Sequence, residues 1–122
     1  MSMQDERRRH IRFEVPLDVT FRPLNDQAPY SAGVIRNFSR SGCCIESGDP
    51  ETSLKEILEL KVRHPQKDMF VNATGDIVWK RPVGGGWLAG VRILEMDKAA
   101  KSEILDFAYD IWLEKNLKLS QA

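Results

Sequence analysis

Hydrophobic and polar residues alternate along most of this chain, with the period of two that is typical of half-buried β-strands. The first such run spans residues 15–21. Further runs show the same alternation at 31–37, 43–46, 58–62, 69–80 and 87–93. The segments between them are rich in glycine, proline, serine and asparagine, which favour turns. The pattern therefore predicts about six antiparallel strands.

The run at 69–80 has the clearest alternation and carries a glycine in its interior. One of its predicted faces consists of Met69, Val71, Ala73, Gly75, Ile77 and Trp79. Gly75 within this run predicts a bend or bulge, which a strand often needs when a small barrel closes. The following segment, 82–86, reads Pro-Val-Gly-Gly-Gly and predicts a flexible hairpin loop.

The period changes from that of a strand to that of a helix at Asp97, whose carboxylate can cap a helix N-terminus. One apolar stripe then follows with helical spacing: Ile104, Leu105, Ala108, Ile111 and Trp112. We expect a helix over 97–115, with lysines near its C-terminal end, and a polar tail over 116–122. Residues 51–57 fit either a short helical lead-in or a loop.

These elements predict a mainly β fold: a six-stranded antiparallel barrel over residues 15–96, followed by the C-terminal helix. The helix either covers an opening of the barrel or serves a partner. Residues 1–14 are polar and charged, and we expect them to form a flexible arginine-rich arm rather than part of the core. The length of 122 residues fits a single domain.

Composition excludes several classes of function. Lys+Arg and Asp+Glu are equal at 18 each, so the chain has no overall field for nucleic acid, and an anion site must be local. There is no apolar run long enough to insert into a membrane, and no apolar run follows the basic N-terminus as in a secretory signal. The adjacent Cys43 and Cys44 are interpreted as reduced packing thiols in a cytoplasmic protein. With His10 and His64 far apart and no CxxC or HExxH, we expect no metal site.

Two short motifs carry the candidate chemistry. Segment 7–12 reads Arg-Arg-Arg-His-Ile-Arg and contains an RxxxR spacing, and segment 37–42 reads Asn-Phe-Ser-Arg-Ser-Gly and contains an NxSxxG spacing. The residues at the motif positions are Arg8, Arg12, Asn37, Ser39 and Gly42. In this order and on this strand pattern, the motifs resemble the PilZ domain, a bacterial receptor module for cyclic di-GMP. The resemblance covers residues 6–115.

The resemblance implies that the arginine arm folds over one face of the barrel and that cyclic di-GMP binds there. Arg8 and Arg12 would bind guanine and phosphate groups, because the planar arginine fork matches the O6 and N7 acceptors of guanine as well as phosphate oxygens. Asn37 can accept from the N1–H and N2–H edge, and Ser39 can donate or accept. Gly42 permits a positive φ or a close approach of the backbone to the ligand. The family more often has Asp at position 37, so Asn offers less acceptor capacity and no charge.

Five further residues are candidates for ligand contact. Arg7 and Arg9 lie beside the RxxxR motif and would serve the extra phosphates of a stacked ligand dimer, which some family members bind. Arg36 and Arg40 flank the second motif and add positive potential. Trp79, at a strand end, is a candidate for base stacking, although packing is the more common role for a tryptophan.

Three other functions compete with a cyclic di-GMP receptor that signals to a partner protein by ordering its arm. A PilZ-fold adaptor could act without the ligand, although intact motifs argue against it. Nucleic-acid binding through the arm is disfavoured by the balanced charge. An enzyme is not supported, because we find no catalytic triad and no phosphate-binding GxxxxGK motif, and Gly84–Gly86 precedes a strand. We therefore expect no cofactor other than the ligand itself.

Overall fold

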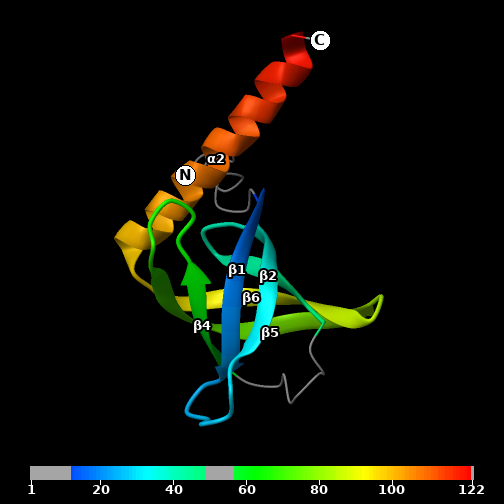
Figure 1. Ribbon diagram of the computed structural model, residues 1–122, viewed down its shortest axis with the longest axis vertical. Helices are drawn as coiled ribbons and strands as arrows, with labels where there is room; N and C mark the ends of the chain where they lie inside the picture. The colour runs from blue at the N-terminus through cyan, green and yellow to red at the C-terminus, as the bar shows by residue number, and fades with distance from the viewer. Residues whose placement is uncertain (1–11, 49–56, 122) are drawn as a thin grey trace, which may run out of the picture.

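The computed structural model describes residues 12–48 and 57–121 and contains a closed antiparallel barrel (Figure 1). Within these residues the strands are β1 (Phe13–Pro23), β2 (Ser31–Phe38), β3 (Gly42–Ser47), β4 (Ile57–Arg63), β5 (Phe70–Val83) and β6 (Gly86–Met96). They close in the order β1-β2-β3-β6-β5-β4. One helix, α2 (Lys98–Gln121), follows the barrel. The predicted fold class, a six-stranded barrel with a C-terminal helix, is confirmed.

The core lies inside the barrel and is built from alternate residues of each strand. On β1 the buried positions are Val15, Leu17, Val19 and Phe21, while their neighbours point outward. Phe21 meets Trp87 edge to face at 5.5 Å between ring centroids across the interior. The predicted alternation therefore gives the correct inward face for most strands.

Within the described strands the pairing register shifts at four places: once between β1 and β2, once between β2 and β3, and twice between β5 and β6. Between β2 and β3 the pairing passes from Ile35↔Ile45 to Asn37↔Cys44, so Arg36 is an extra residue on β2. Between β5 and β6 the register shifts next to Gly75, as predicted for this position, but the extra residue is Leu94 on β6, because Thr74 pairs with Glu95 and Gly75 with Ile93. A bulge on β5 itself, at Val78, was not predicted. Since it adds one residue, Trp79 does not share the inward face of Val71 and Ala73 but is 40% exposed, and that prediction was wrong.

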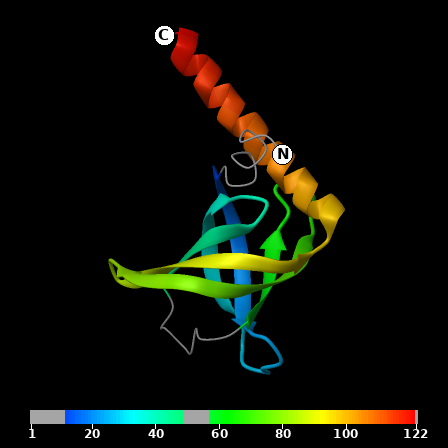
Figure 2. The same cartoon turned by 180° about the vertical axis from the view of Figure 1, so that it is seen from behind.

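The β5–β6 hairpin extends beyond the barrel wall as a two-stranded projection (Figure 2). The predicted loop over 82–86 was too long, because Val83 still pairs with Gly86. The turn is formed by Gly84 and Gly85 alone, and Gly84 adopts a positive φ of 57°. Because glycine has no Cβ and adopts a positive φ easily, these two residues form a tight turn where a longer loop was expected.

Helix α2 closes one end of the barrel with its first half. As predicted, Asp97 caps it, since its carboxylate accepts a hydrogen bond from the Ala100 N–H at 2.9 Å. Ile104 and Ala108 are fully buried against the barrel. The second half projects away from the barrel (Figure 1). The predicted end near Lys115 was wrong: the helix continues to Gln121, because residues 116–121 contain no proline or glycine to stop it.

A buried histidine ties α2 to the β4–β5 turn. The Nδ1 atom of His64 accepts from the backbone N–H groups of Gln66 and Lys67, at 3.1 and 3.2 Å. Its Nε2 therefore carries the proton and donates to a Glu103 carboxylate oxygen at 2.7 Å. The Lys67 ammonium also contacts Glu103, at 2.9 Å. Hydrogen bonds from Lys67 and then His64 hold the pKa of Glu103 below its ordinary value.

Candidate functional site

The two motifs meet on the outer surface where β1 pairs with β2. Glu14 pairs with Asn37, which places Arg12, just before β1, beside the second motif. The Arg12 Nη1 atom donates to Asn37 Oδ1 at 3.2 Å, across 25 residues of sequence. Asn37 points outward because of the Arg36 bulge, which interrupts the alternation between Ile35 and the buried Phe38. The structure thus brings together one residue from each motif.

Ser39 and Gly42 shape the turn that follows. Ser39 is 1% exposed, and its hydroxyl accepts from the Gly42 N–H at 3.2 Å, while the Ser39 N–H donates to the Gly42 carbonyl at 2.8 Å. A Cβ on Gly42 would lie 2.3 Å from the Val91 carbonyl oxygen, so β6 leaves no room for a side chain there. The tight turn holds Asn37 at its entrance in a defined position.

The other candidate arginines differ in what they contact. Arg36 donates to both carboxylate oxygens of Glu46, at 3.0 and 3.2 Å, and this bond lowers the pKa of Glu46. A ligand phosphate would have to compete with that carboxylate. The Arg40 side chain is exposed, and its carbonyl accepts from the Lys101 ammonium of α2 at 3.1 Å. Arg7, Arg8 and Arg9 lie outside the described residues.

A continuous row of outward positions leads from Asn37 to Trp79. Asn37 pairs with Cys44, Cys44 with Gly90, and Gly90 with Trp79. The indole of Trp79 lies across Gly90, since a Cβ on Gly90 would lie 2.1 Å from Trp79 Nε1. Trp79, a candidate from the sequence, is therefore on the same face as Arg12 and Asn37, although it is far from both of them along the chain.

The same face contains an arginine that sequence reasoning missed. The Arg81 guanidinium lies over the Trp79 ring, 5.7 Å from its centroid. Burial raises the pKa of the Cys44 thiol, and the positive charges of Arg12 and Arg81 oppose that effect from nearby. Because Arg12 contacts Asn37 at one end of the row and Arg81 lies over Trp79 at the other end, one surface joins Arg12, Asn37, Cys44, Trp79 and Arg81, which we call the arginine–tryptophan face. No local motif marks Arg81; only strand pairing places it here.

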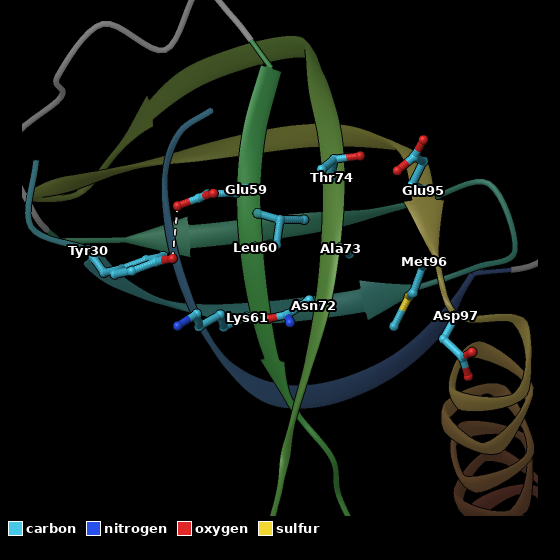
Figure 3. Close-up of a pocket in the computed structure, with 10 residues that line it drawn as sticks. All are labelled: Tyr30, Glu59, Leu60, Lys61, Asn72, Ala73, Thr74, Glu95, Met96 and Asp97. Atoms are coloured by element: carbon cyan, nitrogen blue, oxygen red, sulfur yellow. Dashed lines mark hydrogen bonds between the residues drawn. The ribbon is translucent and has the colours of Figure 1, made fainter. Parts of the chain in front are cut away.

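A cavity of about 440 Å³ lies elsewhere, over β4, β5 and the end of β6 (Figure 3). Among the described residues that line it, Lys61 is the one with a basic side chain, and the carboxylates come from Glu59, Glu95 and Asp97. Glu59 accepts from Arg22 and from the Tyr30 hydroxyl, at 2.8 Å for the latter, and these bonds lower its pKa. An excess of carboxylates repels a phosphate-containing ligand, so this cavity is a poorer anion site than the arginine–tryptophan face.

Within residues 12–48 and 57–121, no three His, Cys, Asp or Glu side chains are grouped so that they could hold a metal ion. The part of the chain that the structure describes contains no helix with the length and apolar character needed to cross a membrane.

A family model described as the PilZ domain matches residues 6–110. Three solved structures have the same fold. The Bacillus subtilis inhibitor of motility MotI (DgrA) has a TM-score of 0.69 at 17% identity, over 86% of this chain and 51% of that chain. The PilZ domain of YcgR from Escherichia coli, solved with c-di-GMP, has a TM-score of 0.65 at 14% identity, over 95% and 99%.

The third structure, MrkH from K. pneumonia in its apo state, has a TM-score of 0.63 at 15% identity, over 88% of this chain and 51% of that chain. This chain therefore spans about half the length of MotI and MrkH and nearly all of the YcgR domain. No curated protein matches the sequence. At these identities the likeness establishes the fold.

Proposed function

The chain belongs to the PilZ family of cyclic di-GMP receptor domains, and we propose that it binds cyclic di-GMP on the arginine–tryptophan face. The observation that carries the proposal is the contact between Arg12 and Asn37, at 3.2 Å, which joins the RxxxR and NxSxxG motifs on one surface. PilZ domains are ligand-binding receptor modules rather than enzymes, and the proposal assigns no catalysis to this chain.

The chemistry of the two residues is complementary to guanine. The Arg12 fork can donate to O6 and N7, or to phosphate oxygens. Asn37 Oδ1 already accepts from Arg12 and has a second lone pair for a guanine N–H donor. Ser39 and Gly42 act by holding the turn, with hydrogen bonds of 2.8 and 3.2 Å between them. We assign Arg8 to the ligand on its motif position alone.

A receptor needs a change that a partner protein can detect. A ligand held by Arg8 and by Asn37 would fix the N-terminal arm against the barrel. Fixing backbone costs about 1–2 kcal/mol per residue, so the ligand must supply contacts that exceed this cost. The new surface of arm and ligand would then be recognised by a downstream protein, through its higher affinity for the bound state.

Isothermal titration with cyclic di-GMP tests the proposal. We expect Arg8→Ala and Arg12→Ala each to weaken binding by about 1–3 kcal/mol, roughly 5- to 150-fold. The matched control is Arg63→Ala. Arg63 lies on β4, which is opposite β3 in the closed barrel, and its guanidinium donates to Asp68. An unchanged affinity in both arm variants would refute the site. No binding by the wild-type domain at high micromolar ligand would refute the function and favour a ligand-independent adaptor.

A further inference from the structure

We infer that helix α2 positions both halves of the proposed ligand site. Lys101 holds the turn of the NxSxxG motif. The aromatic pair Tyr109 and Trp112 holds Phe13, which is the first residue of β1. This inference rests on the proposed function and adds residues that lie outside both motifs. The three helix residues are positioning residues: each acts through the segment that it contacts and not on the ligand itself.

The first contact joins α2 to the turn at whose entrance Asn37 lies. The Lys101 ammonium donates to the Arg40 carbonyl oxygen at 3.1 Å. The next carbonyl of the turn, that of Ser41, accepts from the Ile93 N–H of β6 at 2.9 Å. Two consecutive carbonyl groups are therefore held by donors from two other elements, and this fixes the orientation of their peptide planes. The direction in which the Asn37 amide points depends on this fixed turn.

The second contact is an aromatic cluster at the start of β1. The Phe13 ring meets Tyr109 edge to face at 5.9 Å between centroids, and it meets Trp112 at 6.5 Å. The two helix rings stack on each other at 5.8 Å. Both are 46% exposed, so they belong to the surface rather than to the core. Ring pairs of this kind stabilise beyond their buried area, and Phe13 fixes the backbone from which Arg12 reaches Asn37.

Both contacts lie on a stretch of α2 that is anchored to the barrel. Four residues share one face of the helix at intervals of three or four positions: Lys101, Ile104, Ala108 and Trp112. The two in the middle are fully buried, and the neighbouring Glu103 is hydrogen-bonded to the β4–β5 turn at 2.7 Å. This stretch of the helix therefore acts as one rigid element, and it fixes the NxSxxG turn relative to the start of β1.

A ligand that bridges Arg12 and Asn37 needs both groups at a defined separation. Without the two helix contacts, binding would have to order the turn and the start of β1, and the lost conformational entropy would oppose it. With these contacts the two segments are already in place before the ligand arrives. Loss of either contact should therefore weaken binding, although no ligand-contacting side chain is removed.

Titration of helix variants with cyclic di-GMP tests the inference. Lys101→Met should weaken binding about fivefold, the effect of one lost hydrogen bond, and Lys101→Arg should bind like the wild type, because arginine also donates to a carbonyl. The matched control is Lys98→Met, which removes the same charge from the exposed first residue of α2. Trp112→Ala should also weaken binding about fivefold. Its control is Leu113→Ala, at 37% exposure on the same helix and outside the aromatic cluster.

Double-mutant cycles show through which segment each residue acts. The loss caused by Lys101→Met should disappear in an Asn37→Ala background, because Lys101 acts through the turn that holds Asn37. The loss caused by Trp112→Ala should disappear in an Arg12→Ala background for the corresponding reason. A general loss of stability would instead lower the affinity by the same factor in every background, and that result would overturn the positioning role.

The outcomes separate this inference from the proposed function. If Arg12→Ala weakens binding but the Lys101 and Trp112 variants bind like the wild type, the positioning role is wrong and the proposed function stands. If Lys98→Met weakens binding as much as Lys101→Met, general charge explains the effect and the inference fails. If the wild type does not bind cyclic di-GMP, both are refuted.

Discussion

Replacing Asn37 with Asp tests the guanine-binding role of this position most directly. Asn37 Oδ1 lies 3.2 Å from the Arg12 guanidinium on the outer surface of the barrel. The amide offers one acceptor oxygen, whereas a carboxylate offers two, and guanine presents two donors, N1–H and N2–H, on that edge. Asn37→Asp should therefore strengthen binding of cyclic di-GMP.

The size of the effect follows from the bonds that change. A hydrogen bond to a charged group contributes about 1.5–3 kcal/mol and a neutral one about 1 kcal/mol, so the gain is about 1 kcal/mol, or roughly fivefold. Repulsion between the new charge and the ligand phosphates is small, because the charge is exposed and Arg12 lies beside it. For cyclic di-AMP the carboxylate faces the adenine N1 acceptor, so binding should weaken. Preference for guanine over adenine should rise about tenfold in total.

Parallel titrations of wild type and Asn37→Asp with cyclic di-GMP and cyclic di-AMP measure this ratio. Asn72→Asp is the control, because it makes the same charge change on β5 beside the acidic cavity, away from Arg12. A weaker affinity of Asn37→Asp for cyclic di-GMP, or an unchanged ratio between the two ligands, would refute the assignment of Asn37 to the guanine edge.

Three further predictions concern stability. Ile104→Ala, at a fully buried position where α2 meets the barrel, should lower the free energy of unfolding by about 3 kcal/mol in chemical denaturation. Leu113→Ala, at 37% exposure on the same helix, should lower it by about 1 kcal/mol or less. Equal losses in the two variants would contradict the role of the helix in covering the core. Gly42→Ala should destabilise the domain by about 2 kcal/mol or more because its Cβ would lie 2.3 Å from a β6 carbonyl oxygen, while Gly85→Ala, with nothing within 4 Å, should be near neutral in thermal unfolding. Lys67 and His64 lower the pKa of Glu103, so its ionised carboxylate stabilises the fold above the ordinary pKa of 4.5, and this stabilisation is lost as the pH falls below that value. The free energy of unfolding should therefore differ less between pH 3 and pH 6 in Glu103→Gln than in the wild type. An equal difference in the two proteins would contradict this linkage.

Local patterns along the sequence were enough to predict the barrel. Alternation identifies the strand interiors because a barrel strand has one face in the core and one in water. The Asp97 cap and the helical stripe identify α2 because these are signals within a few residues of each other. The ends of elements were predicted less well. The β5–β6 turn is shorter and the helix longer than expected, because pairing partners and continued backbone hydrogen bonds extend elements beyond their apolar residues.

The sequence by itself also named Arg12 and Asn37, because their motifs are short and their spacing is characteristic. Only the tertiary structure placed Trp79 and Arg81 beside them. That placement depends on the pairing of β3 with β6 and of β6 with β5, and on bulges at Arg36 and Val78 that shift the outward face by one residue. A bulge reverses the direction of every later side chain in its strand, and strand pairing joins residues far apart in sequence. Neither effect leaves a local signal, so the extent of the candidate site was decided by the closed barrel.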